Sequence, residues 1–445
     1  AHWPLRIVLA ILAAVLVTGI LRGPAPLVAL SPFTILALIS LVFFSLLPAL
    51  ALGVASDTPF IATTKSTTAP LFMRFYSGPS EFILLQFSAM CLFGAALAHR
   101  HKLRGAGPAE VAALPKAAIP HVAIGAVFLI LSLSLFLVTN LWLVELNEFL
   151  KAGLGREIKD GIPPIISFSM AALCYISAGR GGWWPALVVL SGLVVFATLL
   201  TTVSSKASVF VLVSCIALYV LKARPTVRHI VSTASVAALV LFSAVLIQGY
   251  LRNPGAGLLS SNQIATWGNI AVAQKLVMRQ LITAGCLQGV LEKRLHRPEG
   301  QNPFYFASAV VPRIIWRDKP NLSRGNRYAR TYCGLPATSF GVIGGVLDRA
   351  LQNFSITLLG QPVIQAGVSG LVTAQIFLFL VIGLVTVILL GTGSAGIITL
   401  VALLPWLCDF DQSLMLYIAN ALKMFLYMSP ALLALVMVSR RTAAD

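Results

Sequence analysis

Residues 371–390 read LVTAQIFLFLVIGLVTVILL, a stretch of twenty positions without a charged side chain. A helix needs about 20 predominantly apolar residues to cross the hydrocarbon core of a bilayer, which is the length of this stretch. Because backbone N–H and C=O groups cannot stay unpaired in hydrocarbon, a segment that crosses lipid in this way has to be helical. The stretch therefore predicts a transmembrane helix.

Similar apolar stretches fill most of the 445-residue chain. Of its residues, 58% are hydrophobic and only 10% are charged, and the mean hydropathy is +0.91. These values exclude a soluble globular protein. The pattern predicts an all-α polytopic membrane protein with about 11 transmembrane helices. The predicted spans are residues 4–21, 27–54, 81–98, 118–139, 162–178, 183–200, 208–221, 230–249, 371–390, 391–407 and 413–438.

These spans divide the chain into three parts, with helices one to eight in residues 1–249, a large loop in 250–370 and helices nine to eleven in 371–445. Short loops rich in Lys and Arg mark the cytoplasmic side of a membrane protein. If the spans alternate, one side receives most of the short basic loops, namely Arg22, residues 99–104, Arg180, residues 222–229 and Arg440 with Arg441. We therefore expect the large loop between helices eight and nine to be extracytoplasmic.

The large loop is strongly basic. Between Tyr250 and Ser355 it contains thirteen Arg or Lys residues and four Asp or Glu residues. Long translocated segments are largely exempt from the charge rule, so the predicted topology stands. Clustered cations repel one another unless an anion lies between them, and the forked Arg guanidinium is suited to phosphate or diphosphate. A surface attracted to lipid headgroups is the alternative interpretation.

Other features of the loop suggest that it is folded. Residues 270–290 have the pattern of an amphipathic helix at the membrane surface, and further short helices are predicted after it. Cys286 and Cys333 both fall in the loop, where an oxidising compartment permits a disulfide.

The densest group of charges is the sequence PRIIWRDKP at residues 312–320, which is followed by Arg324, Arg327 and Arg330. Residues three apart on a helix lie near one face, so these last three cations would be neighbours. This segment is the strongest candidate in the loop for binding a phosphorylated ligand.

The sequence PRIIWRDKP resembles the Pro-Arg-x-x-Trp-x-x-Lys-Pro block of Wzy-type oligosaccharide repeat-unit polymerases. A second similarity is LGQPVIQAGVSG at residues 359–370, where this family often has Gly-Glu-x-x-x-x-x-Gly-x-x-Gly. Gln361 stands where a Glu is common, so a basic role for a family Glu is in doubt in this chain. The resemblance also covers the layout, with many helices and one large periplasmic loop.

The resemblance implies a metal-independent glycosyltransferase without a cofactor, folded as a GT-C-like bundle in the bacterial inner membrane with its active site on the periplasmic side. The implied reaction transfers a growing glycan from undecaprenyl diphosphate to an incoming lipid-linked repeat unit, as in O-antigen, lipopolysaccharide and exopolysaccharide synthesis. A flippase and a chain-length regulator are the implied partners, and nucleic acid is not one.

This chemistry suggests roles for particular residues. Cleavage of a glycosyl–diphosphate bond leaves negative charge on the leaving group, which fixed cations stabilise. The acceptor hydroxyl must lose a proton to a base within reach, for which Asp411 and Asp348 are the preferred candidates, with Asp409 close to Asp411 in sequence. The candidates for diphosphate or glycan binding are Arg313, Arg317, Lys319, Arg324, Arg327, Arg252, Arg349, Gln361 and Trp316.

Other functions stay open at this point. An O-antigen ligase or another lipid-linked glycosyltransferase would share the donor and differ in the acceptor. A membrane transporter would also use many helices, although internal repeats and helices broken near the midplane are expected of it. A structural protein of a secretion machine would tolerate a basic loop as well.

Overall fold

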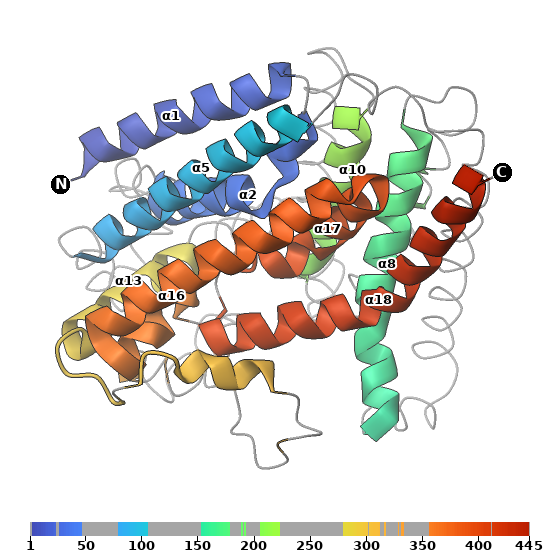
Figure 1. The fold of residues 1–445 in the computed structure, drawn as a ribbon. Helices are drawn as coiled ribbons and strands as arrows, with labels where there is room; N and C mark the ends of the chain where they lie inside the picture. Colours follow the sequence, from blue (N-terminus) through green and yellow to red (C-terminus); the bar gives the residue numbers. More distant parts are fainter. Residues whose placement is uncertain are drawn as a thin grey trace, which may run out of the picture.

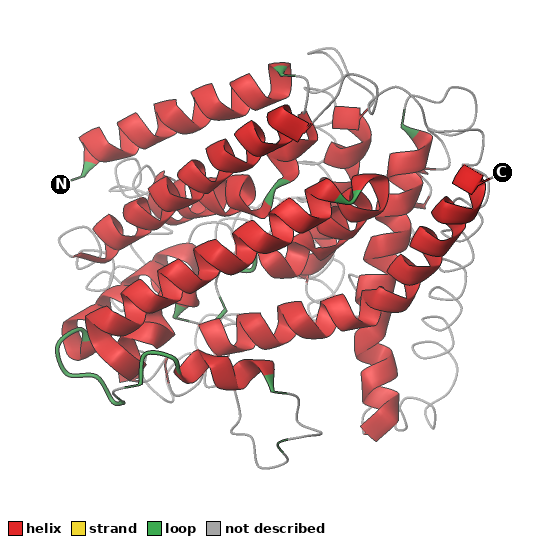
Figure 2. Ribbon diagram, viewed as in Figure 1, coloured by secondary structure: helices red, strands yellow, loops and turns green. Residues whose placement is uncertain are grey.

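The computed structural model is built of helices (Figures 1 and 2), and no strand occurs among the residues that it describes. The described residues are 2–23, 26–46, 79–105, 153–178, 188–189, 191–192, 205–222, 279–300, 302–311, 316, 328, 331–332, 356–410 and 412–444.

Nine α-helices, two 3-10 helices and one π-helix (η2) make up these segments. In chain order they are α1 (Trp3–Arg22), η1 (Pro26–Leu30), α2 (Pro32–Leu38), η2 (Ile39–Leu46), α5 (Pro79–Gly105), α8 (Gly153–Ser177), α10 (Ser205–Lys222), α13 (Arg279–Arg294), η6 (Tyr305–Val310), α16 (Thr357–Gly391), α17 (Gly393–Leu407) and α18 (Leu414–Ala444).

Four of the described helices are long and apolar enough to cross a membrane, namely Trp3–Arg22, Pro79–His101, Thr357–Gly391 and Leu414–Leu433. Shorter apolar helices are Pro32–Leu46, Pro163–Ser177, Phe210–Lys222 and Gly393–Leu407. The prediction of an all-α membrane protein is therefore confirmed. The predicted spans 118–139 and 230–249, and most of 183–200, lie outside the described residues.

The start of α16 differs from its prediction. Helix α16 begins at Thr357, whereas the sequence predicted a span from residue 371 and a loop before it. The ten residues before Gly367 are helical and buried for the most part, so this part of the chain packs inside the protein.

Helices α1 and α5 run in the same direction (Figure 1). Arg6 and Glu81, near the two N-termini, form an ion pair. At the opposite ends a Cβ on Gly23 would lie 3.4 Å from His99 Cε1. Because α2 and η2 return between them, the ends of α1 and α5 reach the same side of the bundle, as the alternating topology predicts.

Helices α8 and α10 also end together, since Lys222 Nζ donates to the Tyr175 carbonyl oxygen at 2.5 Å and lies 3.3 Å from the centre of the Tyr175 ring. η1, which follows α1, packs against α10 and joins these ends to those of α1 and α5. We call this side of the protein the inner end, and the opposite side, which holds α13 and the N-terminus of α16, the outer end.

The core of the bundle is aromatic and aliphatic. Phe410, from the turn between α17 and α18, is wholly buried, with its ring centre 5.0 Å from that of Phe44 and 5.2 Å from that of Phe87. Other large apolar side chains point away from the core. Ile11 and Val15 on α1 and Leu384 on α16 are more than half exposed, as expected of faces that contact lipid.

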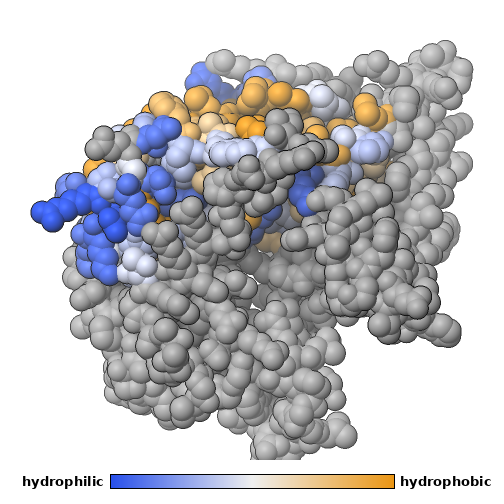
Figure 3. Space-filling view, turned by 90° about the horizontal axis from the view of Figure 1, so that it is seen from below, coloured by the Kyte–Doolittle hydropathy of each residue, from blue (hydrophilic) through white to orange (hydrophobic). Residues whose placement is uncertain are grey.

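Figure 3 shows apolar side chains over part of the described surface and hydrophilic side chains gathered towards the left, where α13 and the segment after it lie in Figure 1. The exposed residues of that segment include Glu292, Lys293, His296 and Arg297. The outer end therefore combines a polar surface with the apolar helices beneath it.

Candidate functional site

The outer end is organised around a kink in α16 at Gly367. This residue has φ 61° and ψ −136°, a conformation that is nearly restricted to glycine. A Cβ at this position would also lie 2.5 Å from the Leu295 carbonyl oxygen. The kink and the close approach of another segment both require glycine here.

The kink frees carbonyl groups that a continuous helix would use. Glu299 N donates to the Ile364 carbonyl oxygen at 2.7 Å, and Gly300 N donates to the Gln365 carbonyl oxygen at 3.0 Å. Buried backbone acceptors need such partners. Residues 295–300, which we call the strap, are thereby fixed to α16.

Gly370, the next glycine of the same sequence pattern, is also required by the backbone around it. A Cβ on Gly370 would lie only 2.3 Å from the Pro362 carbonyl oxygen. The spacing of Gly367 and Gly370, on which the second family similarity rests, is therefore explained by the local backbone of a kinked helix.

A polar network joins the strap to α13 and to Tyr332, which lies in residues 312–332, here called the basic segment. Arg294 Nε donates to the Tyr332 hydroxyl at 3.2 Å, and that hydroxyl donates to Glu299 Oε1 at 3.0 Å. The Arg294 guanidinium lies 3.4 Å from the same carboxylate oxygen, and both side chains are partly exposed. Since the pair is open to solvent, its net contribution to stability is at most about 1 kcal/mol.

Other contacts also hold the end of the basic segment against α13. Lys293 Nζ donates to the Thr331 carbonyl oxygen at 2.6 Å. Tyr328 and Tyr332, one helical turn apart, are both buried, with ring centres 6.3 Å apart. A Cβ on Gly289 would lie 2.1 Å from the Tyr332 carbonyl oxygen, so the segment runs directly against α13. This part of the predicted loop is therefore packed onto the outer end of the bundle.

Two tyrosines of this region are electrostatically unusual. Burial raises the pKa of Tyr332 above its ordinary value of 10.0, an effect that the hydrogen bond from Arg294 opposes and Glu299 reinforces. Burial and the neighbouring Tyr328 raise the pKa of Tyr305 well above the same value. The hydroxyl of Tyr305 has no hydrogen-bond partner within the described structure.

Gln361 lies where the first part of α16 meets the turn between α17 and α18. Its side chain is buried, and its Oε1 accepts a hydrogen bond from Met415 N at 3.1 Å. Leu358 N donates to the Phe410 carbonyl oxygen at 3.1 Å beside it. Met415 N belongs to the first turn of α18, where backbone N–H groups lack partners within the helix. Gln361 therefore caps α18 from a neighbouring helix.

The turn contains Asp409, whose Oδ2 accepts a hydrogen bond from Gln412 Nε2. Gln412 Oε1 in turn accepts from Asn420 Nδ2 at 3.0 Å. These polar contacts lie in and beside the turn that leads into α18, and Met415, the partner of Gln361, is in the first helical turn of α18. The structure thus brings Gln361 together with the segment in which the carboxylate candidates of the turn were predicted.

Most of the predicted site residues lie outside the described residues, and their roles stay predictions. These are the base candidates Asp411 and Asp348 and the cations Arg313, Arg317, Lys319, Arg324, Arg327, Arg252 and Arg349. Trp316 is described and is 38% exposed, so its ring is accessible. Gln361 is buried and its Oε1 already accepts from Met415 N, and its predicted contact with a sugar stays a prediction.

Cys286 on α13 is buried and disulfide-bonded. Its predicted partner, Cys333, lies outside the described residues. The predicted amphipathic helix at residues 270–290 corresponds to α13, which begins at Arg279 and has every side chain from 283 to 291 buried. The helix is therefore packed within the outer end.

Sequence reasoning missed a buried ion pair. Arg6 and Glu81 form it with both side chains fully buried, and Arg6 Nε also donates to Ser45 Oγ at 3.1 Å. Arg6 Cζ lies 4.7 Å from the centre of the Trp3 ring. Arg6 and Glu81 are each a single charged residue in or beside an apolar stretch of the sequence. Such an isolated charge in a membrane helix is the signal from which the pair could have been suspected.

The described fold defines the class as an all-α membrane protein with a folded polar outer end. Comparisons with protein-family models, with curated proteins and with solved structures find no match.

Proposed function

We propose that the chain is a glycan polymerase of the bacterial inner membrane that acts on undecaprenyl-diphosphate-linked repeat units. In this proposal a GT-C-like bundle of about 11 spans carries the site on its periplasmic side. Support comes from the resemblance of residues 312–320 to the Wzy-type block and from the organisation of the outer end.

The observation that carries the proposal is the convergence of three segments at the outer end. The basic segment is anchored to α13 through Tyr332, α13 is joined to α16 by the strap, and the kinked α16 contacts the turn between α17 and α18 through Gln361. These segments carry or border the predicted phosphate-binding cations and a predicted base. Such convergence is required if a donor diphosphate and an acceptor hydroxyl are to meet.

The disulfide of Cys286 supports the same orientation. Disulfides persist in oxidising compartments and are rare in the cytosol. Placing the outer end in the periplasm agrees with this rule and leaves Arg22, Arg100 and Lys222 at the cytoplasmic end, where the positive-inside rule expects them.

In the proposed reaction the acceptor hydroxyl oxygen attacks the anomeric carbon of the donor, and the bond from that carbon to the diphosphate oxygen breaks. The hydroxyl proton passes to a carboxylate, Asp411 or Asp348. The charge left on the diphosphate is stabilised by the guanidinium groups of Arg313 and Arg317, because donors fixed in advance lower the cost of charge development.

The test uses purified protein and an undecaprenyl-diphosphate oligosaccharide, with products separated by length. We expect a ladder of products from the natural chain and its loss in Arg313→Ala and Arg317→Ala. Arg297→Ala is the matched control, because Arg297 is an exposed cation of the strap whose described hydrogen bond is made by its backbone oxygen.

A ladder that survives in Arg313→Ala and Arg317→Ala refutes the proposed role of these cations. If the natural chain adds the glycan once to a different lipid acceptor and makes no ladder, the protein is a ligase.

A further inference from the structure

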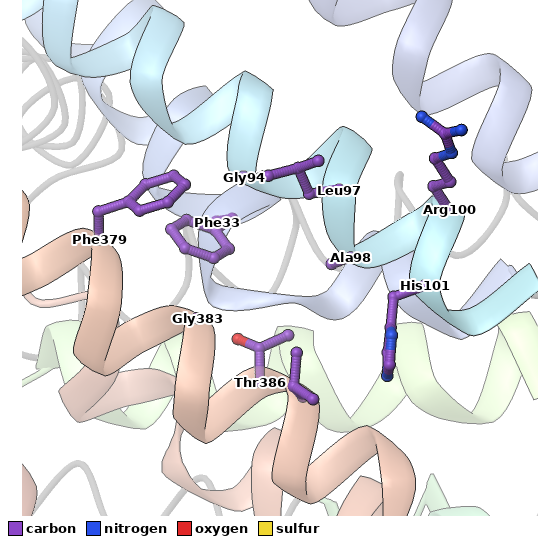
Figure 4. A pocket seen from close by; sticks show the side chains of 10 residues that line it. Phe33, Gly94, Leu97, Ala98, Arg100, His101, Phe379, Gly383 and Thr386 are labelled. Carbon is purple, nitrogen blue, oxygen red and sulfur yellow. The ribbon is translucent and has the colours of Figure 1, made fainter. Parts of the chain in front are cut away.

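A cavity of about 410 Å³ lies between α5 and α16 towards the inner end, away from the proposed catalytic site (Figure 4). Its size falls within the range of about 300–1,000 Å³ that is usual for small-molecule sites. Leu97 on α5 and Val387 on α16 line it and are 44% and 40% exposed. Because both helices are candidate spans, the cavity is accessible from the membrane.

The cavity exists because two glycines face each other across the ring of Phe33. A Cβ on Gly94 would lie 2.7 Å from Phe33 Cδ1, so the ring packs directly on α5. A Cβ on Gly383 would lie 3.7 Å from Phe33 Cζ, an ordinary contact. Phe379 is the second aromatic wall, with its ring centre 5.3 Å from that of Phe33. This end of the cavity is therefore apolar and rigid.

A polar group is buried in the same cavity. Thr386 on α16 is fully buried, and its Oγ1 has no hydrogen-bond partner in the described part of the chain. Figure 4 shows its side chain directed into the space between α5 and α16. An unpaired buried hydroxyl costs about 1–3 kcal/mol, and in helices Thr usually bonds to a carbonyl of the preceding turn. A ligand with an acceptor group would satisfy it.

The other end of the cavity is lined by basic side chains. Arg100 and His101, both exposed, line it and project to opposite sides of α5 (Figure 4). Its described lining contains no carboxylate. Basic pockets between transmembrane helices on the cytoplasmic side suit the phosphate of an anionic lipid.

We propose that this cavity binds an anionic phospholipid from the leaflet at the inner end. One acyl chain lies against Phe33 and Phe379, an ester oxygen accepts a hydrogen bond from Thr386 Oγ1, and the phosphate lies at the end of the cavity that Arg100 and His101 line. The order of apolar, polar and basic groups along the cavity matches the order of chain, ester and phosphate in such a lipid. The inference does not depend on the proposed polymerase activity.

The experiment titrates the purified full chain in detergent with phosphatidylglycerol or with phosphatidylcholine of the same acyl chains, and measures bound lipid by native mass spectrometry. We expect phosphatidylglycerol to bind about tenfold more tightly, because its net charge complements the basic rim. The double variant Arg100→Gln with His101→Gln, which lacks both basic side chains, should lose this preference.

Gly383→Leu should abolish tight binding by filling the cavity. Gly19→Leu is its matched control, since Gly19 is an exposed glycine of a membrane helix with no atom within 4 Å of an added Cβ. Thr386→Val keeps the side-chain volume and should weaken phosphatidylglycerol binding, so it tests the site even where Gly383→Leu disturbs folding.

Three results would overturn the inference. The first is equal binding of the two lipids to the natural chain, and the second is undiminished binding to a folded Gly383→Leu or Thr386→Val protein. The third is a higher affinity for undecaprenyl phosphate than for phosphatidylglycerol, which would assign the cavity to an isoprenoid chain.

Discussion

The kink at Gly367 makes a strong prediction, because Gly367→Ala should destabilise the outer end through two separate effects. An alanine held at φ 61° and ψ −136° carries a backbone strain of about 1–3 kcal/mol. Its Cβ would also lie 2.5 Å from the Leu295 carbonyl oxygen, closer than such atoms approach, so the strap has to move.

Movement of the strap breaks its two backbone hydrogen bonds to α16, from Glu299 N and Gly300 N. Each is worth about 0.5–1.5 kcal/mol net, so the total expected loss is about 2–6 kcal/mol. Gly19→Ala should instead raise the free energy of unfolding, by up to about 1 kcal/mol, because Gly19 lies inside α1 with open space around it.

The free energy of unfolding of both variants should be measured in mixed micelles of mild detergent and sodium dodecyl sulfate. Amide hydrogen exchange should be followed at Glu299 and Gly300, where we expect faster exchange in Gly367→Ala and no change in Gly19→Ala. A Gly367→Ala protein as stable as the natural one, or one with unchanged exchange at both amides, would refute this account of the kink.

Three other substitutions test individual contacts. Glu81→Ala leaves the buried guanidinium of Arg6 without its carboxylate and should lower the free energy of unfolding by about 3–5 kcal/mol. The double variant Arg6→Met with Glu81→Leu should recover most of this loss. A Glu81→Ala protein as stable as the natural one would contradict the burial of the pair. Tyr332→Phe should cost about 0.5–1.5 kcal/mol near neutral pH. Because the pKa of Tyr332 is raised in the folded protein, its stabilising effect is complete below pH 10.0 and is lost as the pH rises through the folded value, so the natural chain should lose more stability than Tyr332→Phe in alkaline unfolding titrations. Gln361→Ala removes the acceptor for Met415 N and should cost about 0.5–2 kcal/mol, whereas Gln361→Glu keeps an acceptor and should cost less in the same unfolding assay.

The four long apolar helices of the described residues could be predicted from sequence because the bilayer imposes one length and one composition on every helix that crosses it. The start of α16 could not. Residues 360–370 contain Pro362, Gly367 and Gly370, which locally favour a loop. They form a kinked helix because the strap, distant in sequence, supplies donors for the carbonyl groups that the kink exposes.

The candidate site was predictable in its residue types more than in its contacts. The alternation of spans predicted that residues 250–370 lie on the outer side, and their excess of cations suggested a phosphate site. The structure packs Tyr332 of this segment against α13. The network of Arg294, Glu299 and Tyr332 joins residues up to 38 positions apart, and Arg6 meets Glu81 from a different helix. No local pattern encodes such pairings, since each depends on how the helices pack.

The C-termini of α1 and α5, like those of α8 and α10, lie at the inner end, and this arrangement has an electrostatic consequence. Each helix carries a partial negative charge, equivalent to about half an elementary charge, at its C-terminus. Gathering these termini on one side creates a local negative field, which Arg22 and Lys222, both in the last turns of their helices, neutralise. Arg22 and Lys222, on which the predicted orientation in the membrane partly rests, therefore also compensate the dipoles of the helices that carry them.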